Sequence, residues 1–244
     1  TPVFEEMQAS ACLMNADSAA QRQLLYRDSD WRKQLRGEWL SRFGASFHKD
    51  LAQMQIVGCP DTALVGRSFA DVAVQRGQAA VDTFIDLISE FDENIRWHSV
   101  IANDRPAEMR RYLQHPYIQL GFSDAGAHNR NLAFQNSHLW FLRDCLLHAD
   151  ALPIEKAVWR ITGELADWFG LDAGYLREGR VADVLVLDPQ ALKTDLSGPQ
   201  ETTDARFDGA MRMVTRSGRA VQQVIVGGQV VLDQGQPHAQ FEQR

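Results

Sequence analysis

Gly121-Phe122-Ser123-Asp124-Ala125-Gly126-Ala127-His128 is the stretch of sequence on which the fold prediction depends. It follows the apolar run Tyr117-Ile118-Gln119-Leu120, which has the pattern of a short strand. A strand that ends in an acid is typical of the C-terminal mouth of an α/β barrel, where such proteins keep their chemistry. The small residues after the acid would let a substrate approach the backbone. Asp124 is therefore the candidate catalytic residue, and the alternative is that it only caps the loop or the following helix.

The composition is that of an ordinary globular protein. The chain has 244 residues, of which 45% are hydrophobic and 23% are charged, enough for one large domain or one and a half smaller ones. The formal net charge of −7 repels phosphate backbones, so we expect no nucleic-acid partner. No apolar stretch has the length of a membrane span, so we expect no membrane partner either.

The cysteine pattern predicts a reducing, cytoplasmic location. The chain has three cysteines, Cys12, Cys59 and Cys145, which are widely spaced and form no Cys-x-x-Cys motif. The odd number and the spacing argue against a disulfide framework or a zinc knuckle. The chain also begins at Thr1 without a starting methionine or a visible signal peptide. We therefore expect a chain that has been trimmed or that is a piece of a longer protein.

Residues 94–122 predict one βαβ unit. Residues 94–102 read as a strand, residues 106–113 as a helix with Pro106 near its first position, and residues 117–122 as the next strand. Two strands joined by such a crossover must be parallel and right-handed.

Other signals outline the elements on either side. Ser68 and Asp71 form an approximate capping box for a helix that Gly77 stops. Residues 79–91 form a further helix, whose apolar face carries Val81, Phe84, Ile85 and Ile88. Helices are also expected within residues 19–43 and over 139–148, 154–161 and 164–169. A buried strand is expected over 181–187 with a turn at Asp188-Pro189, followed by a long loop over 193–209 and a hairpin at Gly227-Gly228. The pattern divides the chain into an α/β region, residues 1–171, and a small β module, residues 172–244.

Several segments, in this order, carry a resemblance to a known family. The chain resembles the C-terminal portion of the amidohydrolase superfamily, and most of all its D-aminoacylase, or N-acyl-D-amino-acid deacylase, branch. The resemblance runs from about Leu64 to about Leu232, and its motifs are residues 65–77 (VGRSFADVAVQRG), the Asp124 stretch, and residues 152–166, 169–171, 176–189 and 224–231.

The resemblance implies an α/β fold and a hydrolase. Residues 1–171 would be the C-terminal part of a (β/α)8 TIM barrel, its last strands and helices, and residues 172–244 would be half of a small β-sandwich. The implied activity is metal-dependent hydrolysis of amide bonds, C–N bonds other than peptide bonds, in small-molecule substrates, with zinc as cofactor. Asp124 matches the aspartate that ends the eighth barrel strand and shuttles the proton, and it is also a candidate metal ligand.

The expected metal ligands are mostly missing. The family has a His-x-His at the end of the first strand, and this sequence contains no His-x-His; its seven histidines are scattered. The resemblance implies that most ligands lie outside this segment, before Thr1, and that the chain is incomplete. A barrel of two strands cannot close, so we expect either a missing N-terminal segment or a homo-oligomer.

Four further residues are candidates for substrate binding or for the second shell of the site. His98 ends the predicted seventh strand, Asn103 follows it, and His128 follows Asp124; the alternative for each is a structural role. His138 stands where the D-aminoacylases have an arginine that holds the substrate carboxylate, which puts an N-acyl-D-amino acid substrate in question. Arg130 and Arg143 lie nearby in the sequence and could replace that arginine.

Two alternatives compete with the hydrolase. The chain could be a non-catalytic amidohydrolase-like scaffold or assembly subunit that has lost its metal ligands. It could also be an unrelated α/β binding module, which would make the ordered resemblance accidental.

Overall fold

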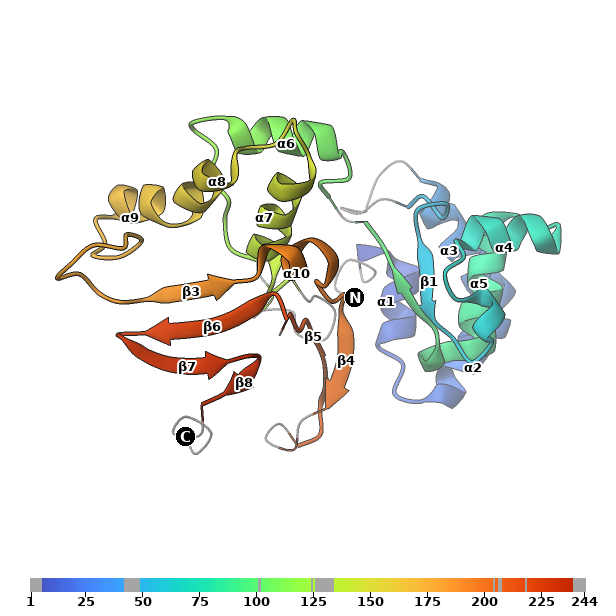
Figure 1. Cartoon of the computed structure of the whole chain (residues 1–244). Coiled ribbons are helices and arrows are strands. Elements are labelled where there is room, and N and C mark those ends of the chain that lie inside the picture. Colours follow the sequence, from blue (N-terminus) through green and yellow to red (C-terminus); the bar gives the residue numbers. More distant parts are fainter. Residues whose placement is uncertain are drawn as a thin grey trace. The chain divides into compact units, whose positions relative to one another are not determined.

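The computed structural model describes residues 6–41, 49–100, 102–123, 125, 134–203, 205, 208–217 and 219–238. The chain forms two compact units, residues 1–105 and residues 106–244 (Figure 1). Each unit has its own cluster of buried apolar side chains. Helices and short antiparallel sheets make up both units, so the chain is an α/β protein as predicted.

The first unit joins a pair of strands to several helices. Strands β1 and β2 pair antiparallel, with Ile56 opposite Trp97, and Figure 1 shows α4 and α5 on one side of this pair. The elements of this unit are α1 (Gln8–Met14), α2 (Ala19–Arg27), α3 (Ser29–Leu40), β1 (Gln55–Gly58), η2 (Thr62–Leu64), α4 (Phe69–Arg76), α5 (Ala80–Phe91), η3 (Asp92–Asn94) and β2 (Arg96–His98).

An aromatic cluster forms the centre of the first unit. The Phe84 ring lies 4.6 Å from Trp39, 5.0 Å from Phe69 and 5.5 Å from Trp97, measured between ring centroids. The apolar face expected on α5 is confirmed, because Val81, Phe84, Ile85 and Ile88 are all buried. Large aromatic side chains bury much apolar area each, so this cluster supplies much of the stability of the unit.

The capping signals in the sequence are confirmed at α4. Ser68 Oγ accepts a hydrogen bond from the Asp71 amide (3.0 Å), and the Asp71 carboxylate accepts one from the Ser68 amide (3.2 Å). The Ser68 hydroxyl also donates to the Asp71 carboxylate (2.7 Å), and this bond, together with the one from the Ser68 amide, lowers the pKa of Asp71. Gly77 ends the helix in the left-handed conformation, φ 63°, which glycine adopts without steric cost.

The second unit combines helices with two antiparallel sheets. One sheet has the strand order β3-β6-β7-β8, and β4 pairs with β5 in the other. The elements are α6 (Pro106–Gln114), α7 (Ser137–Leu147), α8 (Ile154–Ile161), α9 (Gly163–Phe169), β3 (Val184–Leu187), α10 (Pro189–Thr194), β4 (Gln200–Thr203), β5 (Met211–Val214), β6 (Val221–Val226), β7 (Gln229–Asp233) and β8 (Gln236–Pro237).

The predicted βαβ unit is wrong. The first strand is only Arg96–His98 and pairs antiparallel with β1, and residues 117–122 are not a strand. The side chains of Tyr117 and Phe122 are 90% and 87% exposed. An apolar run predicts burial, but it does not supply the neighbouring strand whose hydrogen bonds a strand requires.

Three expectations for the C-terminal part also need correction. The strand predicted as buried is half exposed, since Leu185 and Val186 are 50% and 39% accessible. The expected turn at Asp188 instead starts helix α10, because the Asp188 carboxylate accepts the amides of Gln190 and Ala191. The loop predicted over residues 193–209 contains strand β4, whose partner β5 is also a new element.

The hairpin at Gly227-Gly228 is confirmed, with both glycines at positive φ. The predicted domain boundary near Leu171 stays a prediction. The second apolar cluster contains Phe141 and Ala157 from before this boundary and Leu192 and Ala220 from after it.

A polar clamp holds the end of α5. Asp92 has an unusual backbone conformation, φ 46° and ψ −120°, and its carboxylate accepts hydrogen bonds from Arg22 Nε (2.8 Å) and Nη2 (2.9 Å) and from the Tyr26 hydroxyl (3.0 Å). The bond to Asp92 raises the pKa of Arg22, and burial raises the pKa of Tyr26. The clamp ties α2 to the end of α5.

We expect Asp92→Asn to lower the free energy of unfolding by about 2 kcal/mol, because two donors shielded from water lose a charged acceptor. Asparagine keeps the shape and the tolerance of positive φ, so the change isolates the charge. Urea unfolding measures the effect. The control is Asp82→Asn, which removes an exposed ion pair with Arg36 worth about 1 kcal/mol or less. A loss at Asp92 no larger than the loss at Asp82 would contradict the assignment.

Candidate functional site

Two of the predicted site residues, Asp124 and His128, lie outside the described residues, as does Arg130. The residues on either side of Asp124 are described. The Ala125 amide donates a hydrogen bond to Ser123 Oγ (3.4 Å), and Ala125 is only 3% exposed. The chain is therefore packed against the protein directly after the candidate acid.

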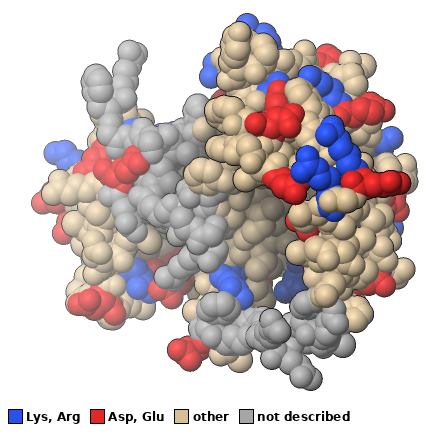
Figure 2. Space-filling view, turned by 90° about the vertical axis from the view of Figure 1, so that its left-hand side faces the viewer, with Lys and Arg blue, Asp and Glu red and all other residues tan. Residues whose placement is uncertain are grey.

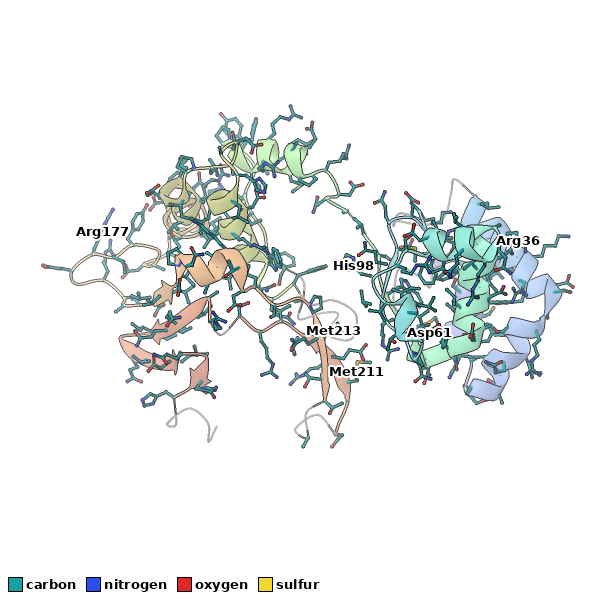
Figure 3. All side chains as sticks on the ribbon, turned by 45° about the vertical axis from the view of Figure 1, so that its right-hand side comes forward. Arg36, Asp61, His98, Arg177, Met211 and Met213 are labelled. Carbon is teal, nitrogen blue, oxygen red and sulfur yellow. The ribbon has the colours of Figure 1, made fainter. Side chains whose placement is uncertain are left out.

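His98 is exposed at the end of β2 (Figure 3). Its neighbour Trp97 turns toward the helices, with its ring 6.0 Å from Phe69 and 5.5 Å from Phe84. Side chains alternate along a strand, so His98 lies on the opposite face from this aromatic core. The imidazole therefore lies outside the aromatic core, and its predicted role in substrate binding stays a prediction.

Asn103 has a conformational reason to be asparagine. It is exposed and adopts φ 61°, the left-handed region that asparagine tolerates better than most other residues. This backbone role is an alternative to the predicted role in substrate binding. Asn103 and His98 belong to the first unit, whereas His138 belongs to the second.

His138 is half-buried in the first turn of α7. Asn136, the residue before the helix, is buried, and its Nδ2 donates to the Ser217 hydroxyl (3.4 Å) and to the Ser197 carbonyl (3.5 Å). These bonds tie the start of α7 to the segments around β4 and β5. Asn136 had no visible signal in the sequence, because its partners are distant along the chain.

Arg143 lies further along α7 and carries an unsatisfied donor. Its guanidinium stacks over the Trp140 ring, 4.6 Å from the centroid, and its buried Nε makes no hydrogen bond. A cation held over an aromatic face is kept in place without using its donors. The predicted role of Arg143 in binding a substrate carboxylate stays a prediction.

The described part of the chain contains no group of three His, Cys, Asp or Glu side chains that could hold a metal ion. A zinc site needs three or four such ligands converging on one point. The described residues thus do not fit zinc by themselves, and His98 and His138 are not part of a ligand cluster within them.

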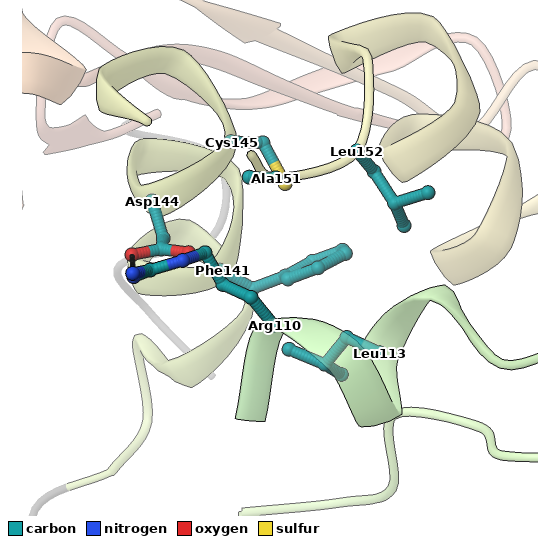
Figure 4. Close-up of a pocket in the computed structure, with 7 residues that line it drawn as sticks. All are labelled: Arg110, Leu113, Phe141, Asp144, Cys145, Ala151 and Leu152. Atoms are coloured by element: carbon teal, nitrogen blue, oxygen red, sulfur yellow. Dashed lines mark hydrogen bonds and ion pairs between the residues drawn. The ribbon is translucent and has the colours of Figure 1, made fainter. Parts of the chain in front are cut away.

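A shallow hollow in the second unit does not match the predicted site. Figure 4 shows its lining: Arg110, Leu113, Phe141, Asp144, Cys145, Ala151 and Leu152. Arg110 Nη1 lies 3.4 Å from Asp144 Oδ1, which neutralises the charges at its edge. Burial raises the pKa of Cys145, so its thiol is a poor nucleophile near neutral pH. The hollow is a packing feature between α6 and α7.

Acidic and basic side chains are interspersed on the face of the molecule shown in Figure 2. Within the described residues, no helix combines the length and the apolar character that crossing a membrane requires.

Sequence reasoning assigned no role to Arg160, which the structure places in the interior. It is 3% exposed, and its guanidinium donates hydrogen bonds to the carbonyls of His115 and Ile118. The signal that could have found it is an arginine on the apolar face of α8, beside Ala157 and Ile161.

Comparisons with known proteins give relatives and structural neighbours. No protein-family model matches the chain. Uncharacterised proteins of Mycobacterium tuberculosis and Mycobacterium bovis are 40% identical over 248 residues, which is 98% of this chain and 40% of theirs. The chain thus spans about two fifths of the length of these relatives.

Two solved structures are of the branch that the sequence motifs resemble. A D-aminoacylase described with a binuclear metal centre is 22% identical, with a TM-score of 0.44 over 79% of this chain and 37% of its own. The N-acyl-D-glutamate deacylase of Bordetella bronchiseptica, described in complex with zinc and a phosphonate inhibitor, is 22% identical, with a TM-score of 0.42 over 78% of this chain and 36% of its own.

Variants of Asn103 separate its backbone role from any chemical role. We expect Asn103→Ala to lower the free energy of unfolding by about 1 kcal/mol, because alanine disfavours φ 61°. Asn103→Gly should leave stability nearly unchanged, since glycine adopts this φ freely. Thermal unfolding of the two variants tests this. Equal losses in both would mean that the side-chain amide, rather than the backbone, carries the stability.

Proposed function

We propose that this chain is the C-terminal part of a metal-dependent hydrolase of amide bonds, of the D-aminoacylase kind, in which Asp124 is the acid/base. What supports the proposal is the ordered set of motifs from about Leu64 to about Leu232. Within it, the segment before Asp124 is attached to α8 at Ile118, and the residue after it, Ala125, is buried. The described residues on both sides of Asp124 are therefore held by the rest of the protein, and general acid/base catalysis requires a positioned side chain.

The proposed chemistry is proton transfer by Asp124. The carboxylate removes a proton from water as the water oxygen bonds to the amide carbonyl carbon. Asp124 then donates this proton to the amide nitrogen, the C–N bond breaks, and a carboxylic acid and an amine are released. Because the proton taken from water leaves with the amine, Asp124 ends the cycle ionised, as it began. A side chain in this role contributes about 10²- to 10⁴-fold to the rate.

Zinc is the proposed cofactor, with ligands outside the described residues. The described His, Cys, Asp and Glu side chains offer no cluster for it. We propose that the complete protein supplies the ligands. Zinc content of the purified complete protein and of the 244-residue chain, measured by elemental mass spectrometry, tests this placement. About one zinc per 244-residue chain would place the ligands within it.

The fold proposal keeps the division of the chain at residues 171 and 172. We propose that residues 1–171 belong to the end of a (β/α)8 barrel and residues 172–244 to half of a β-sandwich. The antiparallel sheet β3-β6-β7-β8 supports the second part. We also propose a cytoplasmic location, which the free thiols of Cys12, Cys59 and Cys145 favour.

We propose that the substrate is a small N-acyl compound with a carboxylate. The guanidinium of Arg143, which stacks on Trp140, would bind the carboxylate, and the half-buried His138 lies at the start of the same helix. His98, Asn103 and His128 are proposed as contacts around the substrate. Arginine holds a carboxylate more firmly than histidine because its donors match the two oxygens.

Asp124→Asn should lower kcat about 10²- to 10⁴-fold in the complete protein, because asparagine cannot accept the proton. The free energy of unfolding should change by less than about 0.5 kcal/mol. Release of amine from a panel of N-acetyl-D- and N-acetyl-L-amino acids, with zinc supplied, measures turnover. The exposed Asp30→Asn is the matched control and should keep full activity.

Unchanged turnover in Asp124→Asn would remove Asp124 from its role. A complete wild-type protein with neither turnover nor bound metal would favour the non-catalytic scaffold instead.

Arg143→Met should raise KM for N-acyl amino acids by at least about tenfold, the cost of one charged hydrogen bond, while kcat stays within about threefold. Methionine keeps the apolar contact with Trp140. The matched substrate is the corresponding N-acyl amine without a carboxylate, whose KM should not change. An equal rise for both substrates would show that Arg143 acts on the fold and not on the carboxylate.

A further inference from the structure

Arg160 stands out because it is charged and buried. Among the described residues, the buried polar side chains are Ser10, Ser68, Thr83, Asn136 and Arg160, and the last is the charged one. It lies on the face of α8 that also carries Ala157 and Ile161, which pack in the second apolar cluster. Burying a guanidinium is costly unless its donors are satisfied, so its contacts indicate what it is for.

The guanidinium contacts three groups. Nη1 donates to the His115 carbonyl at 3.0 Å, Nη2 donates to the Ile118 carbonyl, and Nε lies 3.3 Å from Glu164 Oε2. Two of the three partners are backbone oxygens of one segment. Glu164 is one turn further along the helical region and neutralises the charge. The planar fork of arginine can reach all three at once, which the single ammonium of lysine cannot.

The segment that Arg160 binds leads directly to the candidate acid. Residues 115–123 follow α6 and have no strand among them, so no sheet ladder holds them within the described structure. Leu120 in this segment is also partly buried against the second apolar cluster. Asp124 lies six positions after Ile118. Hydrogen bonds from Arg160 thus take the place of strand pairing in fixing the path of the backbone.

We propose that Arg160 is a positioning residue, whose buried guanidinium on α8 orders the 115–123 backbone and thereby places Asp124. The catalytic part of this inference rests on the function proposed for Asp124. The ordering of the segment does not, because it follows from the hydrogen bonds of Arg160 alone. A displacement of about 1 Å in a catalytic group lowers the rate by about 100-fold, so a positioning residue without substrate contact has a measurable effect.

Arg160→Met and Arg160→Lys test the proposal in the complete protein. Methionine fills the apolar space and removes every donor, whereas lysine keeps the charge and can satisfy one carbonyl. The matched control is Arg110→Met in the same unit, because Arg110 pairs with the carboxylates of Asp144 and Asp150. It removes a partly buried arginine and its two ion pairs without removing a bond to residues 115–123.

Hydrogen exchange is the first readout and needs no activity. In Arg160→Met, amide exchange in peptides covering residues 115–125 should rise by at least about tenfold, with α7 unchanged. Arg160→Lys should give a smaller rise, and Arg110→Met should leave this segment as in the wild type. Unchanged exchange at 115–125 in both Arg160 variants would overturn the proposal. If Arg160→Met does not fold, Arg160→Lys alone carries the comparison.

Steady-state kinetics is the second readout. Arg160→Met should lower kcat by at least about tenfold with KM within about threefold, and Arg160→Lys should recover part of the loss. Faster exchange with wild-type kcat would overturn the positioning role and leave the proposed function intact. An inactive wild-type protein would instead reject the proposed function, and the exchange data would still decide whether Arg160 orders the segment.

Discussion

The burial of apolar side chains in two separate clusters is the constraint on which the rest of the structure depends. In the first unit, Phe84 on α5 sits among aromatic rings from α3, α4 and β2. In the second unit, Phe141 and Leu142 of α7 pack with Ala157 of α8 and Leu192 of α10. Each cluster lies within one unit, so the helices and short sheets are arranged around it. The strands themselves are short and antiparallel and depend on the helices that cover them.

Polar contacts then decide which backbone path each unit follows. Asp92 ends α5 with the help of Arg22 and Tyr26, Asn136 ties α7 to two serines, and Arg160 attaches residues 115–118 to α8. All of these groups are shielded from water, so breaking any one leaves an unpaired donor or acceptor in the interior. Such contacts specify a unique arrangement more than they add to the total stability.

The second unit also leaves apolar side chains in contact with solvent. Trp168 and Phe169 at the end of α9 are 69% and 64% exposed, with ring centroids 4.9 Å apart, and Leu176 is 80% exposed. The chain spans 40% of the length of its mycobacterial relatives.

Local patterns in the sequence determined several of the helices and the hairpin. The Ser68–Asp71 capping box, the stop at Gly77, the apolar face of α5 and the turn at Gly227-Gly228 all act within a few residues, and each is confirmed. The sequence also singled out Asp124 by its place after an apolar run. Its predicted role stays a prediction, as does the role of each other candidate in the site.

Only the tertiary structure decided which segments find hydrogen-bond partners. Residues 117–122 have the composition of a strand but no neighbouring strand, whereas β4 and β5 have a weak pattern and pair with each other. The partners of Arg160 lie 42 and 45 positions away, too far for any local rule to connect. The periodicity of a sequence indicates which side chains are buried. The hydrogen-bond partners of the backbone N–H and C=O groups depend instead on which segments the packing places next to each other.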